Sequence, residues 1–371
     1  MNRRFIGLGL VVVAVAAVAA IGLNLRPPSD STAQVTSSPA PSSSPGEVTH
    51  PPGRMGSLAY GADGDVYVAD WDGSNPVRIA NGVAGGNGRG PAGYWGEGPI
   101  WSPDGRYLAF RGGIDQSSGV PGHGTVYISD PKGHRVASFP GEGWLLSWSP
   151  DSTRVTAWVR QGRTIGIYGL DDVREKLLTL PRGLMVTGDV DPVWSPDGAS
   201  LLVKDVEIPI DGSTPRRLPA DDPRSAWVST YSPDGARVAY QTSWHTPLVV
   251  AAADGSQARE LVSRGMGNHA VWSPTDDLIA FDARTGGEIL GAPKTALRVV
   301  DVASGAVTSL TASGASERVL RFSPDGDRIL FSRTDANDVS SLWSVDADGS
   351  NPQRLVTGTD WGDWSQLSAT R

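Results

Sequence analysis

The stretch that decides the fold is Trp101-Ser102-Pro103-Asp104-Gly105-Arg106-Tyr107-Leu108-Ala109-Phe110. In this stretch an apolar run ends at an aromatic residue, and the proline presets φ at the second position of a turn. The aspartate can accept hydrogen bonds from nearby backbone amides, and the glycine tolerates the positive φ from which a return strand begins. The pattern predicts a tight hairpin between two buried strands.

The same signature begins five more times, at Trp148, Trp194, Tyr231, Trp272 and Phe322. The intervals of 37 to 50 residues between successive copies are typical of propeller blades. Each hairpin is followed by a third apolar strand, an Asp-Gly-type turn and a fourth strand, with no convincing amphipathic helix. Ser152 replaces the glycine of the second copy and Thr275-Asp276 replace Asp-Gly in the fifth, so we expect these two turns to be strained or differently shaped.

The two ends of the repeat region complement each other. Near the start, strands are expected at Ser57–Tyr60, Val66–Asp70 and Val77–Ala80 without a preceding first strand, whereas Asp363–Leu367 is a first strand without successors. Pairing them would close a ring and remove the free sheet edges. Residues 54–371 are therefore predicted to form an all-β, seven-bladed β-propeller of four-stranded antiparallel blades, closed by the C-terminal strand, with about 45 residues per blade. Misreading one repeat would give six or eight blades.

The N-terminal region has a different character. Arg3 and Arg4 precede an uncharged, mostly apolar run from Phe5 to Leu23, which as a helix would be about 28 Å long, close to the hydrocarbon thickness of a bilayer. We expect residues 1–26 to be a cytoplasmic tail and a transmembrane signal-anchor helix, with the propeller on the extracytoplasmic side. Cleavage after Ala17-Val18-Ala19, giving a secreted protein, is the alternative. Residues 27–53 are dominated by Ser, Pro and Thr and are expected to be a disordered linker.

Composition excludes several classes of protein. The chain has 46 Gly and 28 Pro, which indicates many turns and argues against a helical protein. It has no Cys, which excludes a disulfide framework, a cysteine-based zinc site and a cysteine nucleophile. The formal net charge of −8 disfavours general binding to nucleic acid.

The Trp-Ser-Pro-Asp-Gly copies, together with strands such as Asp346-Ala347-Asp348-Gly349-Ser350-Asn351-Pro352-Gln353-Arg354-Leu355, resemble the repeats of the TolB-type, WD40-like β-propeller superfamily. The resemblance covers residues 57–371 and implies the propeller fold. TolB itself has a small α/β domain before its propeller and works in the Tol–Pal envelope system, whereas an anchor and a linker are expected here. Similar propellers occur in prolyl-oligopeptidase-like enzymes, but the G-x-S-x-G elbow of their hydrolase domain is missing from this sequence.

Neither a metal nor another cofactor is expected. The five histidines are scattered, with no pair at metal-binding spacing. Asp70-Trp71-Asp72-Gly73-Ser74-Asn75 begins like a calcium loop but has no glutamate at its twelfth position, so we interpret it as a hairpin turn. The repeated aromatic residue of each blade is predicted to pack between blades.

Loop lengths suggest where binding occurs. The S-P-D-G and Asp-Gly turns are short and lie on one face of the predicted disc, while the other connections vary in length and lie on the opposite face. The longest of them are 81–97, 111–124 and 284–295. Long loops on a rigid scaffold are common binding elements, although neutral drift on a solvent-exposed face would give the same pattern. We expect the short-turn face to take no part in binding.

Residues just before the repeated aromatic should ring the channel mouth on the long-loop face. Aromatic residues with polar neighbours are common in peptide, glycan and small-ligand sites. The expected binding residues are Trp95, Glu97, Trp144, Asp191, Trp227, His269, Arg318, Asp360 and Trp361, with Asp189, Asn268 and Glu317 beside them.

These patterns favour a membrane-tethered binding or scaffolding module of the bacterial cell envelope, with no catalytic residues. Its expected partners are an envelope protein, a peptide or a glycan, and the cytoplasmic membrane through residues 5–23. Two alternatives remain: a propeller hydrolase or lyase that uses channel carboxylates with a divalent ion, and a TolB-like subunit of an envelope complex. Carboxylate or amide groups that converge on one point in the channel would favour the enzyme.

Overall fold

The computed structural model describes residues 56–80, 98–114, 123–182, 184, 192–218, 228–241, 247–263, 266–285 and 294–365, apart from 64, 161–162, 172 and 313. These residues belong to a unit that spans Pro45–Arg371, separate from Met1–Ser44. The predicted anchor and linker lie outside the described residues. In the part of the chain that is described, no helix is long and apolar enough to cross a membrane.

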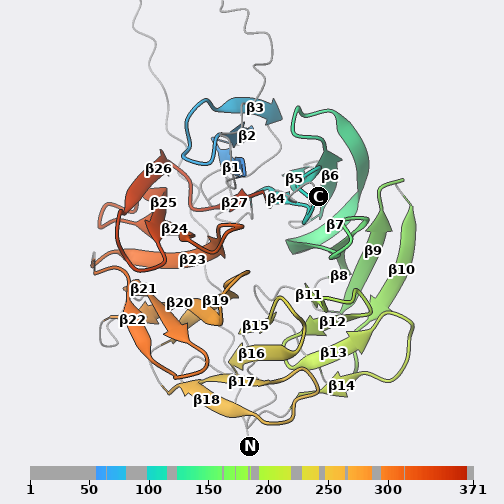
Figure 1. The fold of residues 1–371 in the computed structure, drawn as a ribbon. Coiled ribbons are helices and arrows are strands. Elements are labelled where there is room, and N and C mark those ends of the chain that lie inside the picture. Colours follow the sequence, from blue (N-terminus) through green and yellow to red (C-terminus); the bar gives the residue numbers. More distant parts are fainter. Residues whose placement is uncertain are drawn as a thin grey trace, which may run out of the picture. The chain divides into compact units, whose positions relative to one another are not determined.

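The two ends of the repeat region share one blade, as the sequence predicts. The sheet has the order β27-β1-β2-β3, with the bounds β1 (Leu58–Ala62), β2 (Asp65–Ala69), β3 (Val77–Ala80) and β27 (Gly362–Trp364). Leu58 is opposite Trp364 and Tyr60 is opposite Gly362 in an antiparallel register. Ser57 extends the pairing, because its amide donates to Ser365 Oγ and its carbonyl accepts from the Ser365 amide. The ring is therefore closed by the C-terminal strand (Figure 1).

The next two blades are joined in one seven-stranded sheet. Its strands are β4 (Ile100–Trp101), β5 (Leu108–Ile114), β6 (His123–Ser129), β7 (Arg135–Trp148), β8 (Arg154–Arg160), β9 (Thr164–Gly169) and β10 (Arg174–Thr179). The long strand β7 serves both blades: its first half pairs with β6 as an outer strand, and its second half pairs with β8 as an inner strand. The loop expected between these two blades is therefore absent.

Four further blades follow, each with four antiparallel strands in chain order. Their strands are β11 (Val193–Trp194), β12 (Ser200–Val203), β13 (Val206–Pro209) and β14 (Arg216–Arg217); β15 (Val228–Tyr231), β16 (Arg237–Gln241), β17 (Leu248–Ala252) and β18 (Arg259–Val262); β19 (Met266–Trp272), β20 (Leu278–Arg284), β21 (Thr295–Asp301) and β22 (Val307–Ser309); β23 (Ser316–Phe322), β24 (Arg328–Thr334), β25 (Ser340–Asp346) and β26 (Gln353–Thr357). The described residues thus form an all-β propeller with seven blades.

The repeated aromatic residues pack between blades, as predicted. Trp101, Trp148, Trp194, Trp272 and Phe322 are all buried. In three blades the indole N–H donates to a backbone carbonyl of the preceding blade. The accepting residue is the one directly before the repeated aromatic of that preceding blade. These bonds run from Trp148 to Ile100, from Trp194 to Ser147 and from Trp272 to Thr230. Each aromatic therefore links two sheets as well as filling the space between them.

The hairpin turns behave as their sequences suggest. Gly105, Gly198, Gly235 and Gly326 have positive φ, and Ser152 adopts the same conformation with φ 60°, which is uncommon for a residue other than glycine. The Ser152 hydroxyl accepts a hydrogen bond from the Asp104 amide in the neighbouring turn, at 3.0 Å. A serine side chain at this position therefore ties two blades together.

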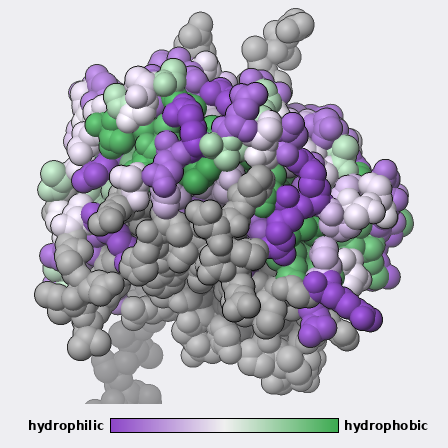
Figure 2. All heavy atoms as spheres, turned by 90° about the horizontal axis from the view of Figure 1, so that it is seen from below, coloured by the Kyte–Doolittle hydropathy of each residue, from purple (hydrophilic) through white to green (hydrophobic). Residues whose placement is uncertain are grey.

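The outer surface of the unit is mixed in character. Figure 2 shows one side, on which hydrophilic residues predominate and hydrophobic residues lie between them in smaller groups. The large apolar side chains that are exposed belong mainly to the outer part of the blades, for example Val136, Leu177 and Val307. Single exposed apolar residues are normal on a soluble protein surface.

The turn aspartates predict a loss of stability in acid. Hydrogen bonds from Ser195 Oγ to Asp197 and from Ser232 Oγ to Asp234, each 2.6 Å long, lower the pKa of both carboxyls. Because the pKa is lower in the folded chain than the unfolded value of about 3.9, their contribution is present above that pH. It is lost as pH falls from there through the folded pKa.

We expect the free energy of unfolding, measured in urea between about pH 5 and pH 2.5, to fall less steeply when both residues are replaced. The double variant Asp197→Asn/Asp234→Asn keeps acceptor oxygens in the turns but cannot titrate. An unchanged pH slope would show that these carboxylates do not contribute.

Candidate functional site

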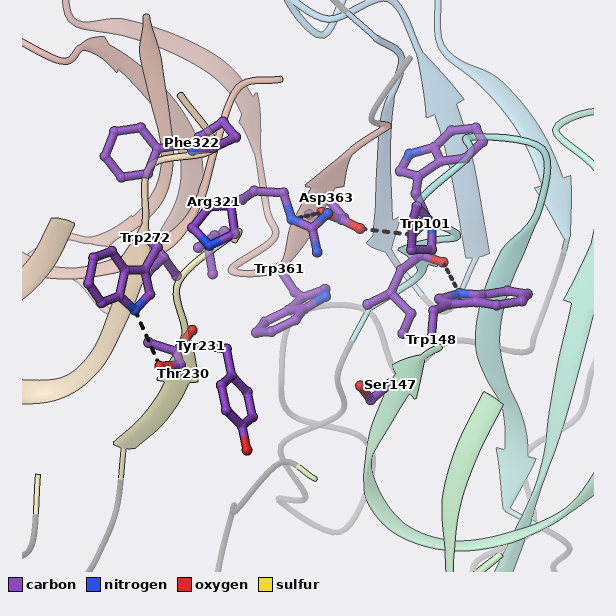
Figure 3. A pocket seen from close by; sticks show the side chains of 17 residues that line it. Trp101, Ser147, Trp148, Thr230, Tyr231, Trp272, Arg321, Phe322, Trp361 and Asp363 are labelled. Carbon is purple, nitrogen blue, oxygen red and sulfur yellow. Dashed lines mark hydrogen bonds and ion pairs between the residues drawn. The ribbon is translucent and has the colours of Figure 1, made fainter. Parts of the chain in front are cut away.

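A cavity of about 570 Å³ lies in the central channel, where the inner strands of six blades meet. Its walls combine polar groups with aromatic and aliphatic side chains, and they include prolines of the S-P-D-G turns. The lining residues are Ile100, Trp101, Pro103, Ser147, Trp148, Thr230, Tyr231, Pro233, Val271, Trp272, Pro274, Leu320, Arg321, Phe322, Trp361, Gly362 and Asp363. The cavity is therefore on the side of the channel that the short turns enclose, and it extends as far as Trp361 (Figure 3).

The cavity contains one ion pair, between blades that are neighbours in the ring. Arg321 of β23 approaches Asp363 of β27 with an Nε–Oδ1 distance of 2.7 Å, and the other oxygen of Asp363 accepts the Trp101 amide at 2.8 Å (Figure 3). Burial raises the pKa of Asp363, while the Arg321 guanidinium and the bond from Trp101 oppose that rise. Asp363 thus connects three blades at the point where the ring closes.

A second charged cluster lies at the long-loop end of the same blades. The Arg318 guanidinium is 4.7 Å from the centre of the Trp361 ring, within the range of a cation–π contact. Burial raises the pKa of the neighbouring Asp360, and the charge of Arg318 works in the opposite direction. Within the described residues, Arg318 Nε and Trp361 Nε1 are both buried without a hydrogen-bond partner. Three of the predicted binding residues are thus brought together.

Trp361 depends on a glycine in the next blade. A β-carbon on Gly98 would lie only 2.2 Å from Trp361 Cδ1 and 3.0 Å from Cγ. The indole therefore packs directly against the Gly98 backbone. Gly98 belongs to the blade that follows the closing blade, and Arg318 to the blade that precedes it.

Gly98→Ala is expected to lower the free energy of unfolding by about 1–3 kcal/mol, because the added methyl group overlaps the Trp361 ring. In a Trp361→Ala background the same change should be neutral or slightly stabilising, because the clash is gone and alanine restricts the unfolded chain. Urea unfolding of the two single variants and the double variant tests this coupling. Equal losses in both backgrounds would contradict the close packing.

His269 and Glu317 make other contacts. The His269 amide donates to Asp282 Oδ1 at 2.9 Å, and its ring nitrogen Nδ1 is 3.3 Å from Asp282 Oδ2, so it is tied to its own blade. Glu317 is 1% exposed and forms an ion pair with Arg333 at 2.7 Å. The Glu317 side chain therefore lies within the packed sheets and is not a mouth residue.

Four of the predicted binding residues, Trp95, Glu97, Asp191 and Trp227, lie outside the described residues, as does the predicted loop 81–97. In the predicted loop 111–124, residues 111–114 and 123–124 belong instead to β5 and β6. The backbone of Trp144 belongs to β7. In the described part of the chain, no group of three or more His, Asp or Glu side chains could hold a metal ion.

Sequence reasoning missed Arg321 and Asp363. Both stand immediately before the aromatic of their blade, where other blades carry Ile100, Ser147 or Val271. Opposite charges at this position in two blades, where the other blades carry apolar or small residues, could have indicated an ion pair in the channel.

Comparison with known proteins supports the repeat assignment. No family model matches the chain. It is 34% identical over 123 residues to the Tol-Pal system protein TolB of Anaeromyxobacter dehalogenans, a stretch that covers 30% of this chain and 27% of TolB. The chain therefore matches only about a quarter of the length of this relative.

Solved structures share the architecture at low sequence identity. An oligogalacturonate lyase from Vibrio parahaemolyticus matches with a TM-score of 0.52 and 14% identity, over 70% of this chain and 76% of its own. The dihydro-heme d1 dehydrogenase NirN matches with a TM-score of 0.52 and 15% identity, over 86% of this chain and 77% of its own. Such low identities show a common fold alone. The chain is a seven-bladed β-propeller built from TolB-like repeats.

Proposed function

We propose that this chain is a non-catalytic binding or scaffolding module of the bacterial cell envelope. In this proposal residues 5–23 tether it to the cytoplasmic membrane, and the propeller receives an envelope protein, a peptide or a glycan at the long-loop mouth of its channel. The observation that carries the proposal is the cluster of Arg318, Asp360 and Trp361.

Two features of this cluster support binding. Trp and Arg are the residue types that most often dominate the energy of protein interfaces. Among the described residues, Arg318 Nε and Trp361 Nε1 are buried donors that find no acceptor, and such groups destabilise a protein until a partner accepts their hydrogen bonds. Backbone carbonyls of a peptide and hydroxyls of a glycan are both suitable acceptors.

Site-specific crosslinking in cells tests the proposal. A photoreactive benzoylphenylalanine in place of Trp361 is expected to give an adduct of defined mass, and Arg318→Ala or Asp360→Asn in the same chain should weaken it. The matched control carries the photoreactive residue in place of Val307, which is exposed on an outer strand. Equal adducts from both positions, or none from position 361, would remove the mouth from consideration.

Protease accessibility tests the proposed tether. Protease added to spheroplasts should cleave in residues 27–53 and release a soluble fragment that contains the propeller, because an extended Ser/Pro-rich segment is an easy substrate. A mature protein that begins near Ala20 and is free in the medium would instead indicate signal-peptide cleavage.

A further inference from the structure

The channel cavity has the size of a small-molecule site. Its volume of about 570 Å³ lies within the range of ligand pockets, and its walls offer both aromatic rings and polar groups. Trp272, Tyr231 and Trp361 come from three different blades and surround the same space (Figure 3). Flat apolar surfaces on several sides suit a planar apolar group.

One cationic group in this cavity is both held in place and accessible. The Arg321 side chain is 35% exposed, whereas its partner Asp363 is 4% exposed. Both oxygens of Asp363 are occupied, one by Arg321 Nε and the other by the Trp101 amide. Within the described residues, Asp363 is the ion-pair partner of Arg321, through Nε. Among the described residues, Nη1 and Nη2 make no hydrogen bond, so both can donate to a ligand.

The chemistry of these donors selects a carboxylate. Two N–H groups on one edge of a guanidinium match the two oxygens of a carboxylate in a bidentate arrangement. The charge of Arg321 is already balanced by Asp363, so a single additional negative charge is easier to accommodate than the double charge of a phosphate monoester. Ser147 and Thr230 also line the cavity, and each hydroxyl can donate one hydrogen bond.

We propose that the channel cavity binds a small organic monocarboxylate with a planar apolar body, its carboxylate on Arg321 and its body among Trp272, Tyr231 and Trp361. Asp363 acts as a positioning residue, because its two oxygens hold Arg321 Nε and the Trp101 amide. This site shares Trp361 with the proposed partner site at the mouth, but its ligand's carboxylate is held inside the channel by Arg321. The short-turn side of the channel, from which no binding was expected, supplies the specificity.

Calorimetric titration of the full chain with matched probes tests the proposal. The probes are 2-naphthoate, its neutral amide 2-naphthamide, and 2-naphthyl phosphate. We expect the carboxylate to bind about tenfold more tightly than the amide, because a hydrogen-bonded charge pair contributes at least that much, and more tightly than the phosphate. A peptide that ends in naphthylalanine with a free carboxyl terminus distinguishes a free small molecule from a chain end as the source of the carboxylate.

Substitutions connect the preference to Arg321. Arg321→Lys keeps a positive charge for Asp363 but loses the planar pair of donors, so the preference for the carboxylate over the amide should fall to about threefold or less. The double variant Arg321→Gln/Asp363→Asn replaces the ion pair by neutral groups and should abolish the preference. Arg78→Lys is the matched control, since Arg78 of β3 also pairs with an aspartate, Asp65, and neither residue lines the cavity.

Thermal melting establishes that each variant is folded before titration. Equal binding of 2-naphthoate and 2-naphthamide, an unchanged preference in Arg321→Lys, or no binding of any probe would each overturn the proposal. Crosslinking from position 361 is measured separately, and Arg318 and Asp360 are intact in these variants. A negative titration result therefore does not contradict the proposed partner site, and a negative crosslinking result does not contradict the cavity proposal.

Discussion

Deletion of residues 360–371 is expected to destabilise the propeller by at least about 4 kcal/mol, because it removes a buried tryptophan from a packed core. Trp364 is 1% exposed and its indole donates to the Trp71 carbonyl at 3.0 Å. The deletion also removes Asp363, which leaves the Arg321 guanidinium without its carboxylate. The free energy of unfolding of a whole domain is typically only about 5–15 kcal/mol. Much of the truncated chain should therefore be unfolded, or aggregated through its open sheet edges.

Urea unfolding of the full chain and the truncated chain measures the effect. A shorter deletion, of residues 366–371, is the matched control, because it leaves β27 and its register with β1 in place. If the two deletions unfold at the same urea concentration as the full chain, closure of the ring by β27 does not stabilise the fold.

Glu317→Ala is expected to cost about 3–5 kcal/mol, the usual effect of removing one partner from a buried ion pair. Glu317 binds Arg333 through Oε1 at 2.7 Å. Its other oxygen accepts from the Thr311 hydroxyl and, at 3.3 Å, from the Leu297 amide in the neighbouring blade. Alanine would leave the guanidinium and the Thr311 hydroxyl without this acceptor, while the Leu297 amide keeps its hydrogen bond to Thr311 Oγ1 at 2.9 Å.

Chemical denaturation of three variants separates this effect from a general sensitivity to substitution. Glu260→Ala, at an exposed position of the outer strand β18, should change stability by no more than about 0.5 kcal/mol. The double variant Glu317→Leu/Arg333→Met should recover much of the loss, because apolar residues can replace a buried ion pair. A loss below about 1 kcal/mol in Glu317→Ala would contradict the assigned role.

The fold could be predicted from sequence because its repeat is periodic and its turns are chemically specific. A turn such as Pro103-Asp104-Gly105 fixes where one strand ends and the next begins, and the spacing of its copies fixes the blade. The pairing of the terminal strand followed from counting strands at both ends. The continuous strand β7 was not predicted, because the residues between its two halves do not differ in composition from a loop.

The candidate site was harder to predict, and the inner strand β23 shows why. Alternation along a strand places Glu317 and Arg318 on opposite sides, but sequence alone does not say which side faces the channel. The pairing of β23 with β24 is also irregular between Val319 and Arg321, and such a bulge changes which side chains share a side. The sequence therefore predicted the region of the site, while the geometry of single side chains required the structure.

The shared strand β7 has a mechanical consequence. Elsewhere the described strands of adjacent blades belong to separate sheets, so one blade can be pulled out while its neighbour keeps its own sheet. Between the first two blades after the closing blade, one strand carries the hydrogen bonds of both sheets. Under load applied along the chain, these two blades should extend together in a single long event, because neither can lose β7 without disrupting the other. The propeller would then lengthen in unequal steps even though its repeats are nearly equal in size.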